Sequence, residues 1–265
     1  MRLIECGRII KFGDDKFMNT IYILWLRQIK RYFRSKARMI GSLGQPLLFL
    51  LALGFGFGPI YQKAGQGSYL QFIGPGVIAM AIIFTAIFMG IEIIWDRQFG
   101  FLKETLVAPA SRFEIMIGRT LGGATVATIQ GIFVFLLTLV VGFRPVSLAL
   151  LPLALVFMIL ISLVFTALGT AIATQLQDMQ AFPIIMNFLI MPIFFLSGAI
   201  FPLESFPQPI VTAMSINPLV YGVDGLRGAL IQGAHLGLLN DFFILSLITL
   251  VLLGIGSYLF SKIQV

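Results

Sequence analysis

The sequence predicts an all-α polytopic membrane protein with six transmembrane helices. Of its 265 residues, 58% are hydrophobic and 11% are charged, whereas soluble domains carry about a quarter charged residues. Six apolar runs each approach the roughly 20 residues that a helix needs to cross a bilayer core. Lipid offers the backbone no hydrogen-bonding partner, and these runs are too long for barrel strands, so we expect helices in all six.

Three segments are expected along the chain. Residues 1–18 lack the apolar core of a signal peptide and predict a cytoplasmic N-terminal extension, with a start at Met18 as the alternative to Met1. Residues 19–38 predict an interfacial helix, and residues 39–265 a single transmembrane domain. The expected spans are residues 40–60, 72–94, 120–143, 146–174, 181–201 and 242–261.

The helix over residues 19–38 is predicted to lie in the membrane interface. At about 3.6 residues per turn, its basic side chains share one face and its aromatic and aliphatic side chains the other. Such a helix turns its cations toward anionic headgroups. The alternative is a positive flank that only orients the first span. The basic face consists of Arg27, Lys30, Arg31 and Arg34, opposite Tyr22, Trp25, Leu26, Ile29 and Phe33.

Lysine and arginine positions predict that both termini face the cytoplasm, with the protein in the plasma (inner) membrane. With the N-terminus inside, fifteen basic residues lie on the inner side and three on the outer side. Such a bias sets the orientation of membrane proteins. Because the basic residues cluster beside the spans, the net charge of +7 is not taken as a sign of nucleic-acid binding.

A charged segment separates the second and third expected spans. Residues 95–119 predict a partly helical cytoplasmic loop that meets another protein. At the inner ends of the two flanking spans, Glu92 and Arg119 are expected to form an ion pair, since ionisable groups in membranes tend to be paired. The alternative is that both reach interfacial water. The charges of the segment are Asp96, Arg97, Lys103, Glu104, Arg112, Glu114 and Arg119.

The segment between the fifth and sixth spans predicts two short re-entrant helices on the outer side. It is too apolar for a wet loop, and prolines divide it into pieces too short to span. Asn217 and Pro218 predict a helix start, as N-cap and first helical residue. Asp224 and Arg227, three residues apart, can pair along one face. The motif residues are Pro202, Glu204, Pro207, Asn217, Pro218, Asp224 and Arg227.

Some residues inside the spans favour contact between helices. Gly118 and Gly122 form a G-x-x-x-G pattern that permits close helix approach, within the chain or in a dimer. Gln45, Gln130 and Asn187 are uncharged polar residues in apolar runs. We expect them to hydrogen-bond between helices rather than to contact cargo.

Two parts of the sequence resemble the ABC-2 type permeases, the membrane subunits of ATP-binding-cassette exporters, in their drug-resistance and nodulation-type branch. One is FLSGAIFPLESFP at 195–207 with NPLVYGVDGLRGAL at 217–230, and the other is FLKETLVAPASRFEIMIGRTLGG at 101–123. Together with the basic N-terminal helix and six spans, the resemblance covers nearly the whole chain from about Met18.

The resemblance implies partners that spacing alone does not. Family members pair as dimers, here with an identical copy or a close paralogue, and each protomer docks an ATP-hydrolysing subunit. The loop after the second span acts as a coupling helix, and the N-terminal helix leans on the same ATPase. The re-entrant helices fall on residues 207–215 and 218–231. The coupling contact falls on Arg97, Phe101, Leu102, Lys103 and Glu104.

The chain is expected to be no enzyme and to hold no cofactor or metal. It contains no G-x-x-x-x-G-K-[ST] loop for ATP phosphates, so ATP and Mg belong to the partner. Its single cysteine, Cys6, and single histidine, His235, offer neither a zinc cluster nor a nucleophile–base set.

An amphipathic cargo, such as a drug or lipid moved outward, suits spans with almost no charge. Export of polysaccharide or lipo-oligosaccharide is the alternative within the class. An ion-coupled secondary transporter would carry carboxylates at mid-membrane, whereas here they lie at span ends or in loops. A non-transporting membrane scaffold stays a further alternative.

Overall fold

The computed structural model describes residues 14–63, 67–101, 110–202 and 206–262, which form helices and no strand. The N-terminal part contains α1 (Asp14–Arg34), α2 (Lys36–Lys63), α3 (Tyr69–Phe88) and α4 (Ile91–Gln98). The remaining elements are α6 (Arg112–Val141), the 3₁₀ turn η1 (Leu148–Leu150), α7 (Leu151–Gln175), α8 (Ala181–Phe195), α9 (Gln208–Met214), α10 (Pro218–Ile231) and α11 (Leu238–Ser261).

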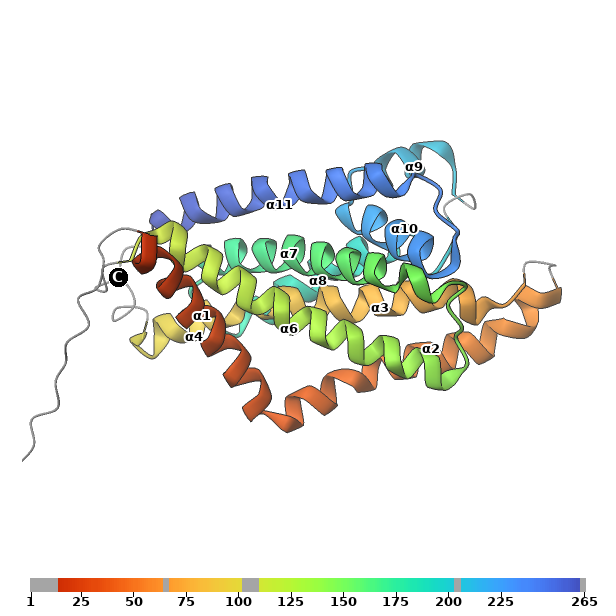
Figure 1. Ribbon diagram of the computed structural model, residues 1–265, viewed down its shortest axis with the longest axis horizontal. Helices are drawn as coiled ribbons and strands as arrows, with labels where there is room; N and C mark the ends of the chain where they lie inside the picture. The colour runs from red at the N-terminus through yellow and green to blue at the C-terminus, as the bar shows by residue number, and fades with distance from the viewer. Residues whose placement is uncertain (1–13, 64–66, 102–109, 203–205, 263–265) are drawn as a thin grey trace, which may run out of the picture.

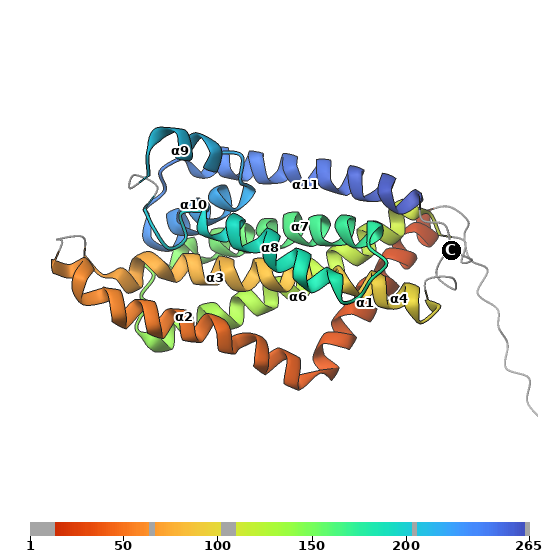
Figure 2. The same cartoon turned by 180° about the vertical axis from the view of Figure 1, so that it is seen from behind.

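Helix α3 lies at the centre of a bundle of roughly parallel and antiparallel helices (Figure 1, Figure 2). In the most apolar 18 residues of Tyr69–Gln98, 78% are buried, against 17% in α2 and 17% in α11. The peripheral helices expose large apolar side chains such as Phe55 and Leu250. This distribution suits a bundle bordered by lipid, in which α2 and α11 are outer helices and α3 is the core.

The bundle has two distinct ends. At one end lie α1, α4 and the last turns of α11, here called the α4 end. At the other lie α9 and α10, here called the α10 end (Figure 1, Figure 2). Helix α4 follows the buried helix α3 in the chain, so the α4 end is connected directly to the centre of the bundle.

Among the described residues, five helical segments, rather than six, are long and apolar enough to cross a membrane. They correspond to the expected spans 40–60, 72–94, 120–143, 146–174 and 242–261. The expected span 181–201 was too long: α8 has 15 residues and ends at Phe195, because the chain turns at Gly198, whose φ is +75°. At 1.5 Å per residue, α8 is shorter than a bilayer core of about 30 Å. A sixth crossing stays a prediction.

The second expected span is broken near its inner end. Helix α3 ends at Phe88, and α4 begins at Ile91 after a turn at Met89 and Gly90. A methyl group at Gly90 would overlap the backbone of Gly169 in α7. The break therefore coincides with a close backbone crossing that only glycine allows.

Helix α6, which contains the third expected span, begins at Arg112, eight residues before the expected start of that span. Ser111 caps it: its Oγ accepts a 3.2 Å hydrogen bond from the backbone N–H of Glu114 and donates one of 2.8 Å to the Glu114 carboxylate. This is a serine cap with glutamate at the third helical position. The S-x-x-E spacing at residues 111–114 is visible in the sequence, and it could have predicted this earlier helix start.

The amphipathic helix occupies Asp14–Arg34 rather than 19–38, and residues 36–38 begin α2. Helix α1 packs on α6, where Gly118 faces Ile21 and Leu24 and Gly122 faces Gln28. The G-x-x-x-G pattern thus allows close packing of α1 on α6 within the same chain. Trp25, expected among the residues facing away from the basic side, donates a 3.0 Å hydrogen bond from Nε1 to Thr125 Oγ1.

Helix α10 begins as predicted. Asn217 is its N-cap, accepting a 2.9 Å hydrogen bond from the N–H of Leu219, and Pro218 is the first helical residue. The expected Asp224–Arg227 pair is not seen. Asp224 instead accepts hydrogen bonds of 2.8–3.0 Å from the N–H groups of His235 and Leu236.

Arg227 has different partners. Its Nη2 donates a 3.0 Å hydrogen bond to the Gly198 carbonyl, and its guanidinium lies 4.2 Å from the centre of the Phe72 ring. The two side chains therefore fasten α10 to two different loops. Helices α9 and α10 coincide with the segments expected to be re-entrant, and their depth in a membrane stays a prediction.

Candidate functional site

An ion-pair cluster at the α4 end joins four helices, and we take it as the candidate functional site. It consists of Arg27 and Arg31 from α1, Arg38 from α2, Glu92 and Asp96 from α4, and Arg119 from α6. The described residues contain no group of three His, Cys, Asp or Glu able to hold a metal ion.

Asp96 is the centre of the cluster. Its Oδ2 accepts a 2.6 Å hydrogen bond from Arg119 Nη2, and its Oδ1 accepts one of 2.7 Å from Arg27 Nη2. A third guanidinium, that of Arg31, lies 3.9 Å from Oδ1. One carboxylate thus links α4 to α1 and α6.

Glu92, one turn earlier on the same face of α4, has other partners. Arg31 Nη1 lies 3.1 Å from its Oε2, and Arg38 Nη1 lies 3.9 Å from its Oε1. The expectation of a Glu92–Arg119 pair was therefore wrong about the partner: Asp96 takes Arg119. The sequence held a signal for this, because residues four apart on a helix share a face and both carboxylates project toward the arginines.

The cluster is buried on one side and open on the other. The side chains of Glu92, Asp96 and Arg119 are 3%, 2% and 3% exposed, whereas those of Arg27, Arg31 and Arg38 are 37%, 32% and 42% exposed. Charges this deep need close partners, because an unpaired buried ion costs several kcal/mol. Four arginines face two carboxylates, so the cluster retains an excess of positive charge on its exposed side.

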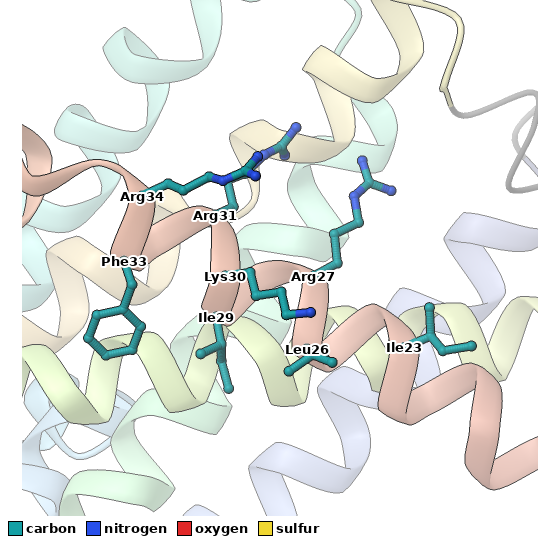
Figure 3. Close-up of a pocket in the computed structure, with 8 residues that line it drawn as sticks. All are labelled: Ile23, Leu26, Arg27, Ile29, Lys30, Arg31, Phe33 and Arg34. Atoms are coloured by element: carbon teal, nitrogen blue, oxygen red, sulfur yellow. The ribbon is translucent and has the colours of Figure 1, made fainter.

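Helix α1 presents its arginines in a way that differs from the prediction. Figure 3 shows Arg27, Arg31 and Arg34 projecting to one side of the helix, and Leu26, Ile29 and Phe33 to the other. Two of the four predicted headgroup-binding cations, Arg27 and Arg31, are engaged by Asp96 and Glu92. A hollow of about 790 Å³ follows the helix and is lined by Ile23, Leu26, Arg27, Ile29, Lys30, Arg31, Phe33 and Arg34.

Tyr32 and Gln130 complete the attachment of α1. Tyr32 donates a 2.7 Å hydrogen bond to Gln130 Oε1 inside the protein. Burial raises the pKa of the Tyr32 hydroxyl above its ordinary value of 10.0, so the group stays protonated and able to donate. The expected contact of Gln130 between helices is confirmed.

The predicted coupling residues are only partly described. Arg97 points into the bundle, where its Nη atoms donate hydrogen bonds of 2.8 and 3.1 Å to the carbonyls of Thr174 and Leu176 at the end of α7. Phe101 is 50% exposed at the start of the segment. Leu102, Lys103 and Glu104 lie outside the described residues. Contact of Arg97 and Phe101 with an ATPase stays a prediction.

The predicted motif between α8 and α11 lies at the α10 end of the molecule and does not join the cluster. Besides capping α10, Asn217 donates 2.6 and 3.1 Å hydrogen bonds from Nδ2 to the carbonyls of Ile193 and Leu196. Pro207 precedes α9, and Pro202 lies in the preceding loop. Glu204 lies outside the described residues. This motif is therefore a structural joint between α8 and α10.

Comparison with known proteins agrees with this architecture. The profile of the family described as ABC-2 type transporter matches residues 19–231. The chain is 28% identical to the transport permease ycf38 of Cyanophora paradoxa over 80% of its own length and 74% of that protein. It is 28% identical to the same protein of Porphyra purpurea, over 84% and 80%. It is 29% identical to nodulation protein J of Rhizobium leguminosarum bv. trifolii, over 78% and 76%.

Proposed function

The chain belongs to the ABC-2 type transporter family, a family of membrane transport permeases, and from this premise we propose that it is the permease subunit of an ATP-driven exporter. Its cargo is an amphipathic or lipid-like compound that moves outward across the plasma (inner) membrane. The relatives named transport permease support the transport role. The direction and the cargo class are our inference from the apolar spans and their end-placed charges.

The observation that supports the coupling role best is the fastening of α1, α4 and α6 through Asp96. A push on α1, or on the segment after α4, reaches α4 through hydrogen bonds of 2.6–2.7 Å rather than through loosely packed side chains. Because α4 continues into the buried helix α3, such a push displaces the core of the bundle. Two packings of that core would then alternate as the partner binds and hydrolyses ATP.

Membership of the family implies an ABC ATPase partner, and we place its contact at the α4 end. ATP and Mg²⁺ bind that partner, while this chain contributes positions and movements. Both termini would lie in the cytoplasm on the same side as the ATPase. A second permease, identical or closely related, would complete the pathway.

Reconstitution with candidate ATPases tests the proposal. We expect the chain to co-purify with one of them and, in lipid vesicles, to let amphipathic compounds stimulate ATP hydrolysis and accumulate on the side opposite the ATPase. Stimulation by an oligosaccharide but by no amphipath would indicate the alternative cargo. Absence of any stable ATPase complex, in protein that is folded and inserted, would contradict the proposal.

A further inference from the structure

A second cavity, separate from the hollow along α1, lies where α1, α2, α3 and α4 meet. Its volume is about 440 Å³, within the range of about 300–1,000 Å³ that ligand pockets occupy. It begins beside Arg38 and Ser42 at the start of α2 and extends toward Val126 on α6. None of the residues assigned to coupling or to the re-entrant motif lines it.

The floor and the rim of this cavity differ in chemistry. Met80, Met89 and Val126 form a floor that is buried and apolar, and Phe84 and Phe88 extend it along α3. The rim is polar: Arg38, Ser42 and Gln45 stand one above another on the first turns of α2, and Arg38 and Gln45 are exposed. A molecule that fills this space meets polar atoms at one end and apolar side chains at the other.

Two features of the cavity wall favour a group that is negatively charged and accepts hydrogen bonds. Arg38 has only a distant ionic contact, 3.9 Å to Glu92, and Glu92 lies closer to Arg31, at 3.1 Å. The excess of guanidinium groups in the cluster leaves Arg38 without a carboxylate of its own. In addition, the Trp95 Nε1 hydrogen is buried without a hydrogen-bond acceptor, although Trp95 lines the cavity. A buried donor of this kind costs free energy until an acceptor occupies the site.

We propose that this cavity binds an amphipathic anion, with its acidic group between Arg38 and Trp95 and its apolar tail on Met80, Phe84 and Phe88. Gln45, for which the sequence suggested a contact between helices, contributes to the polar rim instead. This inference deepens the proposed function. It rests on that function only for the statement that the bound anion is cargo. Binding itself requires neither the ATPase nor transport, so the two ideas fail separately.

Tryptophan fluorescence gives a direct test, because the chain has two tryptophans and Trp25 lies on α1, hydrogen-bonded to α6. In a Trp25→Phe background, the full chain in zwitterionic nanodiscs reports on Trp95 alone. The probes are a brominated long-chain alkyl phosphate and the alcohol with the same brominated chain. We expect saturable quenching by the phosphate at concentrations about tenfold below those at which the alcohol quenches, the difference expected for one charge-assisted hydrogen bond.

Arg38→Gln should remove that tenfold preference, whereas Arg34→Gln, a matched loss of one exposed arginine that does not line the cavity, should retain it. Ala81→Leu, which fills the floor, should abolish the saturable component while the unfolding temperature stays near that of the parent. If Ala81→Leu does not fold, the two arginine variants decide alone. Equal quenching by phosphate and alcohol in the parent, or equal behaviour of the two arginine variants, would overturn the proposal.

A further experiment distinguishes an acidic bilayer lipid from a single-chain amphipath as the bound anion. Dibrominated phosphatidylglycerol is compared with dibrominated phosphatidylcholine in the same nanodiscs. Quenching by phosphatidylglycerol that depends on Arg38 identifies an acidic bilayer lipid as an occupant. Quenching that depends on Arg38 with the single-chain phosphate alone identifies a single-chain amphipath. Both results support an anion site, and absence of dependence on Arg38 for every probe refutes it.

Discussion

Asp96 and Arg119 form a 2.6 Å ion pair whose side chains are 2% and 3% exposed, between the end of α4 and the first turns of α6. The same carboxylate holds Arg27 of α1 at 2.7 Å. Through this carboxylate the basic helix α1 is tied to α4, which follows the buried helix α3 in the chain. A force applied from outside the membrane core therefore has a stiff path into it.

Asp96→Asn should destabilise the folded protein, because it leaves the buried Arg119 charge uncompensated. The expected loss is about 3–5 kcal/mol in the free energy of unfolding, measured by denaturant titration in lipid–detergent micelles. Asp178→Asn is the matched control, since Asp178 is an exposed carboxylate in the turn after α7. Equal stability of the two variants would show that the Asp96–Arg119 pair contributes nothing.

Arg27→Gln should weaken coupling more than it weakens folding. Arg27 is 37% exposed and binds Asp96, whereas Lys30, one turn further along α1, is exposed. We expect Arg27→Gln to leave insertion and ATPase binding intact and to lower cargo-stimulated ATP hydrolysis severalfold, with Lys30→Gln near the parent. The check is ATP hydrolysis by the reconstituted complex with and without cargo. Comparable losses in both variants would indicate a general charge effect instead.

Gly122→Ala should loosen α1 from α6. A methyl group there would stand 2.6 Å from Cγ of Gln28, whereas one at Gly58 on α2 meets no atom within 4 Å. Overpacking of this kind costs about 1–3 kcal/mol, against a gain of about 1 kcal/mol in helix propensity that both substitutions share. The unfolding temperature should fall for Gly122→Ala and hold or rise for Gly58→Ala. A lower unfolding temperature for Gly58→Ala than for Gly122→Ala would contradict the packing of α1 on α6.

Much of the fold follows from sequence because membrane helices are governed by length, apolarity and local caps. Apolar runs located the five long helices, and Asn217 with Pro218 located the start of α10. The errors fall where tertiary contacts decide. The break after Phe88 coincides with a close crossing at Gly169, a residue nearly 80 positions further along, and no local pattern near Gly90 encodes it.

The site was predictable in composition but not in pairing. Sequence reasoning identified the basic face of α1 and the charges near the end of the second span. It assigned Glu92 to Arg119, because the two lie at neighbouring span ends, and did not consider Asp96. The choice between two carboxylates on one face of α4 depends on where Arg119 of α6 lies along that helix, a tertiary relationship that no local pattern encodes.

Crosslinking from Phe101 tests the central claim most directly. Cys6 is the only cysteine of the chain, so Cys6→Ser with Phe101→Cys gives a single thiol beside the proposed coupling segment, and Phe243→Cys on α11 gives an exposed control. In the complex with its ATPase, a short bifunctional reagent should join position 101 to the ATPase, with a yield that changes when ATP binds, and should leave position 243 unjoined. Labelling of position 101 by a membrane-impermeant reagent from the external face, with no crosslink to the ATPase, would contradict the account.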